Sequence, residues 1–384
     1  MAIGINNDDT DWYPKESTDK KVHKNMSILD KIKKNSTIKD SALLSESKFF
    51  KKKDMIPTSI PAINIALSGR LDGGLTPGLT MWAGPSKHFK TAFSLLMAKS
   101  YMDKYPDAAL LFYDSEFGTP QSYFDSFGID TNRVIHTPLT NIEQLKFDIM
   151  TQLEGVERAD HLIILIDSIG NLASKKEVED ALEGKSVADM SRAKQIKSLF
   201  RMVTPHLSLK DIPMVVVNHT YKTMELYSKD VVGGGTGSYY SADNIFILGR
   251  QQDKDGTELL GYNFIINVEK SRYVREKSKI PVSVKFDGGI SRWSGLLDMA
   301  LESGHVIKPS NGWYSKVNTE SGEIEEKKYR IKDTDTKEFW LPILMNKTFQ
   351  DWVQSNYQIA NGAIISDDSI NEELATIEDD DESN

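Results

Sequence analysis

Four short apolar segments in the middle of the chain are followed by glycine or polar residues. They are Met81–Ala83, Ala108–Tyr113, His161–Ile166 and Pro213–Val217. Continuous apolar runs of this length are typical of strands buried on both faces of a parallel sheet. The segments between them favour helices near Ala92–Tyr105, Asn141–Arg158 and Asp189–Leu207. Strands that alternate with helices in this way predict an α/β fold with a mostly parallel central sheet.

Later apolar segments follow one another more closely. Strands are predicted at Asn244–Leu248, Tyr262–Val268 and Val282–Phe286, and a helix near Gly295–Ser303. Because too few residues separate these strands for crossover helices, we expect them to extend the sheet with an antiparallel portion.

The polar ends of the chain divide it into four predicted parts. Residues 1–55 combine a basic polar arm (1–40) with a short helix at Ser41–Met55, a candidate oligomerisation segment. Residues 56–318 form the α/β core, and residues 319–363 a small C-terminal region. Residues 364–384 are an acidic tail of a composition typical of disordered segments.

A glycine-containing loop joins the first predicted strand to its helix. Its residues are Gly84, Pro85, Ser86, Lys87, His88 and Phe89, followed by Lys90 and Thr91. In a phosphate-binding loop, backbone N–H groups wrap the phosphates, the lysine reaches the β- and γ-phosphates, and the threonine hydroxyl binds Mg²⁺. Phe89 stands where that motif usually has glycine. The alternative is an ordinary strand-to-helix turn with a lysine in the first helical turn.

Polar side chains follow the other predicted strands. Asp167 follows the apolar run His161–Ile166, Glu116 lies shortly after Tyr113, and Asn218 and His219 follow Val217. Ligands of open α/β sheets bind at the carboxyl ends of the strands. There Asp167 could support Mg²⁺, Glu116 could activate a water molecule, and His219 could sense a γ-phosphate. Singly, each acid could be a helix cap or a solvated strand end, but together they favour nucleotide hydrolysis.

Composition and charge exclude several classes of protein. The 384 residues contain no cysteine, which rules out disulfides, thiol chemistry and cysteine-bound zinc. No apolar run approaches the ~20 residues of a membrane span, and no apolar signal segment begins the chain, so we expect a cytoplasmic protein without a membrane partner. The net charge of −9 is carried by the nine acids of residues 367–384. That tail either only solvates the chain end or competes with DNA for basic loops.

Two predicted loops leave the same edge of the sheet as the nucleotide site. They are Ser174–Ala188 and Thr220–Ser241, and the second contains Gly233–Gly237. Loops of this length inside a compact domain are usually functional or disordered. Glycines let backbone N–H groups approach phosphates, so these loops favour a ligand whose binding is coupled to the nucleotide. The alternative is a flexible surface loop.

These motifs resemble those of RecA-type strand-exchange recombinases, most closely the T-even bacteriophage members. The resemblance runs from about Ser41 to Gly362 and rests on Ser47–Phe50, Gly84–Thr91, Phe112–Gly118, Asp167–Lys176, Gly233–Gly237 and Val268–Arg272. His219 departs from the cellular members, which have a glutamine there that links the γ-phosphate to the second DNA loop.

The resemblance implies a role for each matching residue. Lys90, Thr91 and Asp167 would hold ATP and Mg²⁺, Glu116 would activate water, and Tyr123 would stack on adenine. Lys270 and Arg272 would reach the nucleotide of a neighbouring subunit, although locally they are an exposed strand end. The two loops would hold single-stranded DNA through Lys175, Lys176, Lys185, Arg192, Gly233, Gly234, Gly235, Thr236 and Gly237.

The sequence therefore predicts an ATP-dependent recombinase that forms a filament on single-stranded DNA and pairs it with homologous duplex DNA. The resemblance further implies a recombination mediator and a single-strand-binding protein as partners. One alternative is a RecA-fold hexameric helicase, although Lys270, Arg272 and the Phe49-Phe50 element fit an open filament better. Another is a nucleotide-gated single-strand-binding protein, which would not require Glu116.

Overall fold

The computed structural model describes residues 27–38, 40–49, 54–185, 191–223 and 230–359. The chain divides into two compact units, residues 1–52 and residues 53–384. The first unit contains helix α1 (Ile28–Asn35), capped by Ser27, whose side chain accepts a hydrogen bond from the N–H of Leu29 at 3.1 Å. The predicted arm of residues 1–40 thus includes one helix, and its first 26 residues lie outside the described part.

The predicted helix at residues 41–55 is wrong over its described residues. They contain only a single 3₁₀ turn, η1 (Leu44–Glu46), and residues 50–53 lie outside the description. Leu44 is 69% exposed, so this segment buries no apolar face within its unit. Short helices are marginal without such packing, because nucleation is unfavourable.

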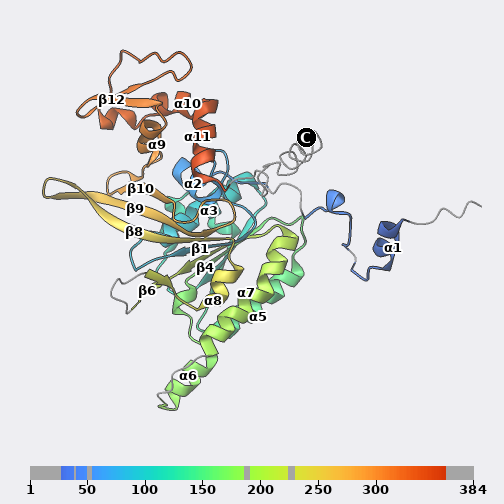
Figure 1. The fold of residues 1–384 in the computed structure, drawn as a ribbon. Coiled ribbons are helices and arrows are strands. Elements are labelled where there is room, and N and C mark those ends of the chain that lie inside the picture. The colour runs from blue at the N-terminus through green and yellow to red at the C-terminus, as the bar shows by residue number, and fades with distance from the viewer. Residues whose placement is uncertain (1–26, 39, 50–53, 186–190, 224–229, 360–384) are drawn as a thin grey trace, which may run out of the picture. The chain divides into compact units, whose positions relative to one another are not determined.

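A nine-stranded sheet forms the centre of the second unit (Figure 1). Its order is β11-β10-β9-β8-β1-β5-β4-β2-β3, and the strands from β8 to β3 run parallel to one another. In this order the bounds are β11 (Gly289–Ile290), β10 (Lys279–Lys285), β9 (Glu258–Ser271), β8 (Asn244–Asp255), β1 (Gly78–Ala83), β5 (Pro213–Asn218), β4 (Leu162–Asp167), β2 (Ala109–Asp114) and β3 (Val134–Pro138). The predicted mostly parallel sheet with an antiparallel extension is confirmed.

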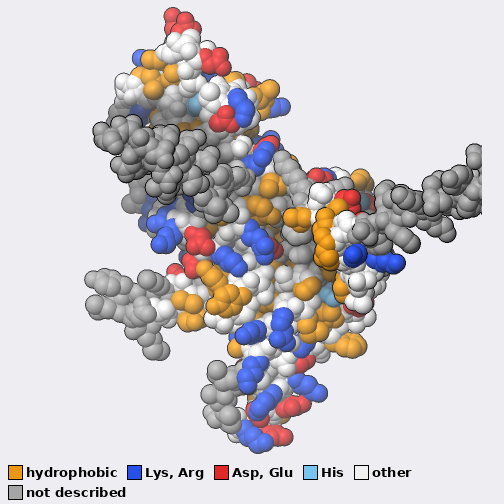
Figure 2. Space-filling view, turned by 45° about the vertical axis from the view of Figure 1, so that its right-hand side comes forward, with side chains coloured by type: hydrophobic (Ala, Val, Ile, Leu, Met, Phe, Trp, Pro, Cys, Tyr) orange, Lys and Arg blue, Asp and Glu red, His pale blue; other side chains and the backbone are white. Residues whose placement is uncertain are grey.

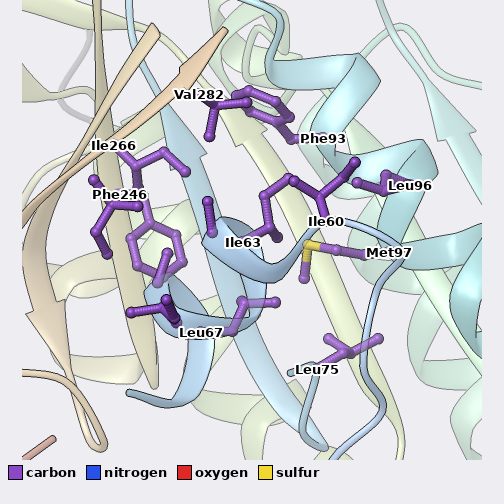
Figure 3. Close-up of a cluster of buried hydrophobic side chains, with 14 of the residues drawn as sticks. Ile60, Ile63, Leu67, Leu75, Phe93, Leu96, Met97, Phe246, Ile266 and Val282 are labelled. Atoms are coloured by element: carbon purple, nitrogen blue, oxygen red, sulfur yellow. The ribbon is translucent and has the colours of Figure 1, made fainter. Parts of the chain in front are cut away.

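Helices cover both faces of this sheet. Successive residues of a strand point to opposite faces, so Leu110 and Phe112 join one core cluster while Leu111 and Tyr113 join the other. Helices α2 (Pro61–Ser68) and α3 (Lys90–Lys104) contribute to the first cluster, and α5 (Ile142–Gly155) and α7 (Ser191–Lys210) to the second. Figure 3 shows the first cluster, where side chains from α2 and α3 meet side chains of β8, β9 and β10. The three predicted helices of the core are therefore confirmed.

A smaller set of elements follows the sheet. It comprises α9 (Leu296–Glu302), β12 (Val306–Ser310), β13 (Trp313–Lys316), η4 (Ile331–Thr334), α10 (Lys337–Met345) and α11 (Lys347–Tyr357). Their buried side chains, such as Trp340 and Phe349, belong to the same hydrophobic cluster as the face covered by α2. After α11, Gln358 forms a bridge with Val274 and touches Gly69, where a Cβ atom would lie 2.8 Å from the Gln358 Cα. The end of the C-terminal region therefore contacts the segments that follow β9 and α2.

The first predicted loop, residues 174–188, contains a helix. Helix α6 (Lys175–Leu182) begins at Ser174, whose hydroxyl accepts from the N–H of Glu177 at 3.0 Å, and Glu177 accepts in return from the N–H of Ser174. This capping box satisfies two backbone N–H groups that a helix start leaves without partners. The prediction of a structureless loop was wrong for residues 175–182, and residues 186–190 lie outside the description.

The second predicted loop, residues 220–241, is also largely ordered. Strands β6 (Thr220–Lys222) and β7 (Asp230–Val232) pair antiparallel, and helix α8 (Thr236–Ser241) follows. Helix α8 lies close to α7 because Gly237 has no side chain: a Cβ atom there would lie 2.6 Å from the Lys197 Cα. Residues 224–229 lie outside the description. No helix among the described residues combines the length and apolar character needed to cross a bilayer.

Candidate nucleotide site

The carboxyl ends of four parallel strands meet at one edge of the sheet. Ala83 at the end of β1 pairs with Asn218 of β5, and Asp114 at the end of β2 pairs with Asp167 of β4. Strands β4 and β5 are themselves neighbours. The polar residues that the sequence placed after separate strands therefore share one region, as expected for a ligand site of an open α/β sheet.

The loop between β1 and α3 has the form of a phosphate-binding loop. Lys90, the first residue of α3, is 6% exposed, and its Nζ donates to the backbone oxygen of Pro85 at 2.8 Å. Burial lowers the pKa of Lys90, while the charges of Glu116 and Asp167 oppose that effect. Phe89 caps α3 without a side-chain hydrogen bond, so the side chain at the cap does not occupy the N–H groups of the first turn. Such groups, together with the lysine, suit an anionic ligand.

Two residues of this loop have left-handed backbone conformations. They are Lys87, with φ of 61°, and Phe89, with φ of 59°. This conformation costs a residue other than glycine about 1–2 kcal/mol. Glycine adopts this conformation without strain, which explains why the usual motif has glycine at the position of Phe89. This chain has phenylalanine there instead.

Thr91 and Asp167 form a buried polar pair. The Thr91 hydroxyl donates to Asp167 Oδ2 at 2.6 Å, whereas Asp167 Oδ1 is buried without a hydrogen-bond partner in the described structure. Burial raises the pKa of Asp167 to about 6, against the influence of the Thr91 hydrogen bond. An unpartnered buried oxygen is costly, and Mg²⁺ takes hydroxyl, carboxylate and phosphate oxygens. The pair therefore fits a magnesium ion that is shared with nucleotide phosphates.

No group of three or more histidine, aspartate or glutamate side chains in the described ranges is arranged to hold a metal ion without further ligands. Mg²⁺ bound mainly through substrate phosphates needs only one or two protein groups. The donor set of Thr91 and Asp167 is sufficient for that mode of binding.

Glu116 and His219 contact each other beside this pair. Their closest atoms, Glu116 Oε1 and His219 Nε2, are 2.9 Å apart, and the same nitrogen lies 3.3 Å from the Ser168 hydroxyl. The hydrogen bond from His219 lowers the pKa of Glu116, and the charge of Lys90 contributes in the same direction. Glu116 is thus an ionised, partly exposed carboxylate that can accept a proton.

Asp114 fixes the loop that carries Glu116. Its Oδ1 accepts from the N–H groups of Glu116 and Phe117 at 3.0 and 2.8 Å, and its Oδ2 lies 3.2 Å from His136 Nε2. The sequence analysis assigned no role to Asp114, although an acid that ends a buried strand is a recognisable signal. The carboxylate position of Glu116 therefore depends on a buried neighbour as well as on His219.

Tyr123 lies on helix α4 (Gln121–Ser126) and is partly buried. Its ring meets Phe127 edge-on, with centroids 5.5 Å apart. Burial raises the pKa of Tyr123, and the charge of Asp167 contributes to the rise.

Lys270 and Arg272 are not brought to the phosphate loop of their own chain. Lys270 of β9 pairs with Ile245 of β8, which in turn pairs with Met81 of β1. The Arg272 N–H donates to the Asp243 backbone oxygen, and the Asp243 N–H donates to the Leu79 backbone oxygen. Lys270 and Arg272 are therefore level with β1 positions that lie two to four residues before the end of that strand, or roughly 7–13 Å along it. The Lys270 ammonium instead donates to the Tyr239 backbone oxygen at 2.7 Å, and Arg272 pairs with the carboxylate of Asp243.

The basic DNA-binding candidates fall into two groups. Lys175, Lys176 and Lys185 are exposed on and after α6, and each lies beside an acid: Glu179, Asp180 and Glu183, respectively. Figure 2 shows this mixture of blue and red side chains on the lower projection. Arg192 differs, because its guanidinium donates to the backbone oxygens of Leu172, Ile169 and Gly170. Its contacts hold the chain that follows β4.

The glycine run joins the histidine directly. The N–H of Gly233 donates to the His219 oxygen at 2.9 Å, and the Asn218 amide donates to the Gly233 oxygen at 2.9 Å. Gly234 and Gly235 have positive φ, Thr236 begins α8, and Gly237 is buried against α7. Because of these hydrogen bonds, a movement of the His219 backbone would also move the glycine run.

Sequence reasoning missed two residues that contact the phosphate loop. Arg250 of β8 donates from Nη1 to the Lys87 backbone oxygen at 3.2 Å, and the Phe264 ring of β9 lies 4.9 Å from that of Phe89. Arg250 and Lys87 are 163 positions apart in the chain. No local pattern could have revealed these contacts.

Comparison with known proteins agrees with this architecture. Residues 23–291 match the RecA N-terminal domain, and residues 293–353 match a domain described as "Bacteriophage T4, Recombination and repair protein, C-terminal domain". The chain is 54% identical to the recombination and repair protein of Enterobacteria phage T4 over 351 residues, which is 90% of this chain and 89% of that protein. It is 27% identical to the RecA protein of Bacteroides thetaiotaomicron over 79% of this chain and 90% of that one. The resemblance seen in the motifs is confirmed, and the chain belongs to the RecA family of strand-exchange recombinases.

Proposed function

We propose that this recombinase is a DNA-dependent ATPase that binds ATP with Mg²⁺ and assembles as a filament on single-stranded DNA. The observation that carries the proposal is the meeting of Lys90, the Thr91–Asp167 pair and the Glu116–His219 pair at one sheet edge. A bound filament would pair its strand with homologous duplex DNA. The name of the phage T4 relative supports roles in recombination and repair, and its source supports action in the cytoplasm of a bacterial host.

The residues around α3 would bind the nucleotide. The N–H groups of Gly84 and of residues 86–89, together with the Lys90 ammonium, would hold the phosphates, and Tyr123 would stack on the adenine. Thr91 and Asp167 would hold Mg²⁺, which neutralises developing phosphate charge when bound.

Glu116 would orient the attacking water molecule and accept its proton. Its partly exposed, ionised carboxylate supports this role, and Asp114 keeps its backbone in place. His219 would couple the site to DNA, because it contacts Glu116 on one side and the glycine run on the other. The loops after β4 and β5 would hold single-stranded DNA, with Lys175, Lys176 and Lys185 as its exposed cations.

A second copy of the chain would complete each site. Lys270 and Arg272 lie well back from the end of β1, which supports contact with the nucleotide of a neighbouring subunit rather than their own. A filament provides such a neighbour for every subunit. A mediator and a single-strand-binding protein remain proposed partners from the family resemblance.

A steady-state ATPase assay with and without single-stranded DNA tests this function. We expect hydrolysis to rise several-fold on addition of single-stranded DNA and to disappear in Lys90→Ala, whose loop lacks the buried ammonium. Activity that does not depend on DNA, or that survives in Lys90→Ala, would refute the proposed site.

A further inference from the structure

The hairpin of β8 and β9 supports the phosphate loop at three successive places. The β8 backbone passes close to Gly84, where a Cβ atom would lie 3.3 Å from the Leu248 oxygen. Arg250 donates to the Lys87 oxygen at 3.2 Å, and Phe264, which pairs with Arg250 across the hairpin, lies against Phe89. The loop therefore rests on a surface formed by residues far away in the chain.

Phe89 makes the most specific of these contacts. The centroid of its ring is 4.9 Å from that of Phe264 and 6.3 Å from that of Phe93, and Phe264 is fully buried. The Phe89 backbone has the left-handed conformation that glycine adopts without strain. A bulky residue keeps such a conformation only where its surroundings impose it. The aromatic contact with β9 supplies such surroundings.

We propose that Phe89 is a positioning residue that anchors the phosphate loop to β9 and holds its N–H groups in the binding shape before ATP arrives. Glycine at this position would allow the free loop many conformations, which binding would have to restrict. Phe89 removes that freedom in advance. Arg250 assists from the same hairpin, and its guanidinium is held over the Tyr262 ring at 4.7 Å. This inference rests on the proposed nucleotide site.

Titration of a fluorescent ATP analogue with Mg²⁺ into the full chain, without DNA, measures the anchor. We expect Phe89→Ala, which removes the ring but keeps the Cβ atom and its backbone preference, to weaken affinity roughly three- to ten-fold, the range of one aromatic pair. Phe89→Tyr keeps the ring and should bind within about two-fold of the unmodified chain. Equal affinity of Phe89→Ala and the unmodified chain would overturn the proposal.

A matched pair of core variants separates anchoring from general stability. Phe264 and Phe246 are both fully buried on adjacent strands, but Phe246 packs on Trp82, with centroids 4.6 Å apart. Phe264→Leu and Phe246→Leu should lower the melting temperature similarly, and only Phe264→Leu should weaken ATP affinity. Combining it with Phe89→Ala should add little, because both remove the same contact. Equal loss of affinity in the two leucine variants would contradict the anchor.

Lys90→Ala distinguishes failure of the anchor from failure of the site. If Lys90→Ala loses the analogue and Phe89→Ala binds it normally, the nucleotide site stands and the anchor is rejected. If Lys90→Ala binds it normally, the proposed site is rejected and the anchor with it.

Discussion

Replacement of Asp167 by asparagine should stabilise the protein in the absence of Mg²⁺ and nucleotide. The Asp167 carboxylate is 2% exposed, and one of its oxygens has no hydrogen-bond partner among the described residues. Burial raises its pKa from 3.8 to about 6. The Asp167 carboxyl therefore binds its proton more tightly in the folded state than in the unfolded state. As pH rises from about 4 through 6, the carboxyl loses this proton and the free energy of unfolding falls.

The size of the effect follows from the same two values. The difference between 3.8 and about 6 corresponds to about 3 kcal/mol of destabilisation at pH 8. Asparagine keeps an oxygen for the Thr91 hydroxyl but leaves its own amide unpartnered, so the gain should be roughly 1–3 kcal/mol. A gain of that size should raise the melting temperature of a chain this long by roughly 1–4 °C.

Thermal unfolding in a chelator, followed by fluorimetry between pH 4 and 8, measures this gain. The advantage of Asp167→Asn should be greatest at pH 8, fall to about half near pH 5 and vanish near pH 4. Asp114→Asn is the matched control, because the Asp114 carboxylate accepts from two N–H groups and should give no such gain. An Asp167→Asn protein no more stable than the unmodified chain at pH 8, or a gain independent of pH, would refute the reasoning.

Three further predictions concern catalysis and DNA. Glu116→Gln should retain ATP and DNA binding in equilibrium assays while hydrolysis falls by ~10²-fold or more; normal turnover would remove its role as the base. The double variant Lys270→Ala/Arg272→Ala should hydrolyse ATP poorly, and mixing it with inactive Lys90→Ala should partly restore DNA-stimulated hydrolysis, because mixed interfaces contain one intact site. Co-assembly without any recovery would contradict a contribution in trans. Deletion of residues 367–384, which lie outside the described structure, removes nine negative charges and should raise duplex-DNA affinity most at low salt, as measured by fluorescence anisotropy.

The elements that the sequence predicted well are those with a strong local signal. The buried strands are apolar on both faces, and the residues that end them, such as Asp167 and Asn218, mark the ligand edge by themselves. Helix α6 had a local signal too, in the spacing of Ser174 and Glu177, but its charged composition suggested a loop. For this segment, the capping residues predicted the structure better than the composition did.

Other features depend on contacts that no local pattern encodes. The predicted helix around Leu44 failed because Leu43 and Leu44 are 38% and 69% exposed in the described structure, and a short helix without buried apolar side chains is marginal. The contact of Phe264 with Phe89 depends on the register of β8 and β9. The roles of individual site residues and the predicted divisions at residues 55, 318 and 363 stay predictions.

Homology-dependent joint formation tests the central claim most directly. Single-stranded circles would be incubated with the protein, ATP and Mg²⁺, and then with linear duplexes of homologous or unrelated sequence. The account predicts joint molecules only with homologous duplex, and their loss when Lys90→Ala replaces the unmodified chain. Directional unwinding without dependence on homology, or joints that form equally well with Lys90→Ala, would contradict an ATP-dependent strand-exchange recombinase.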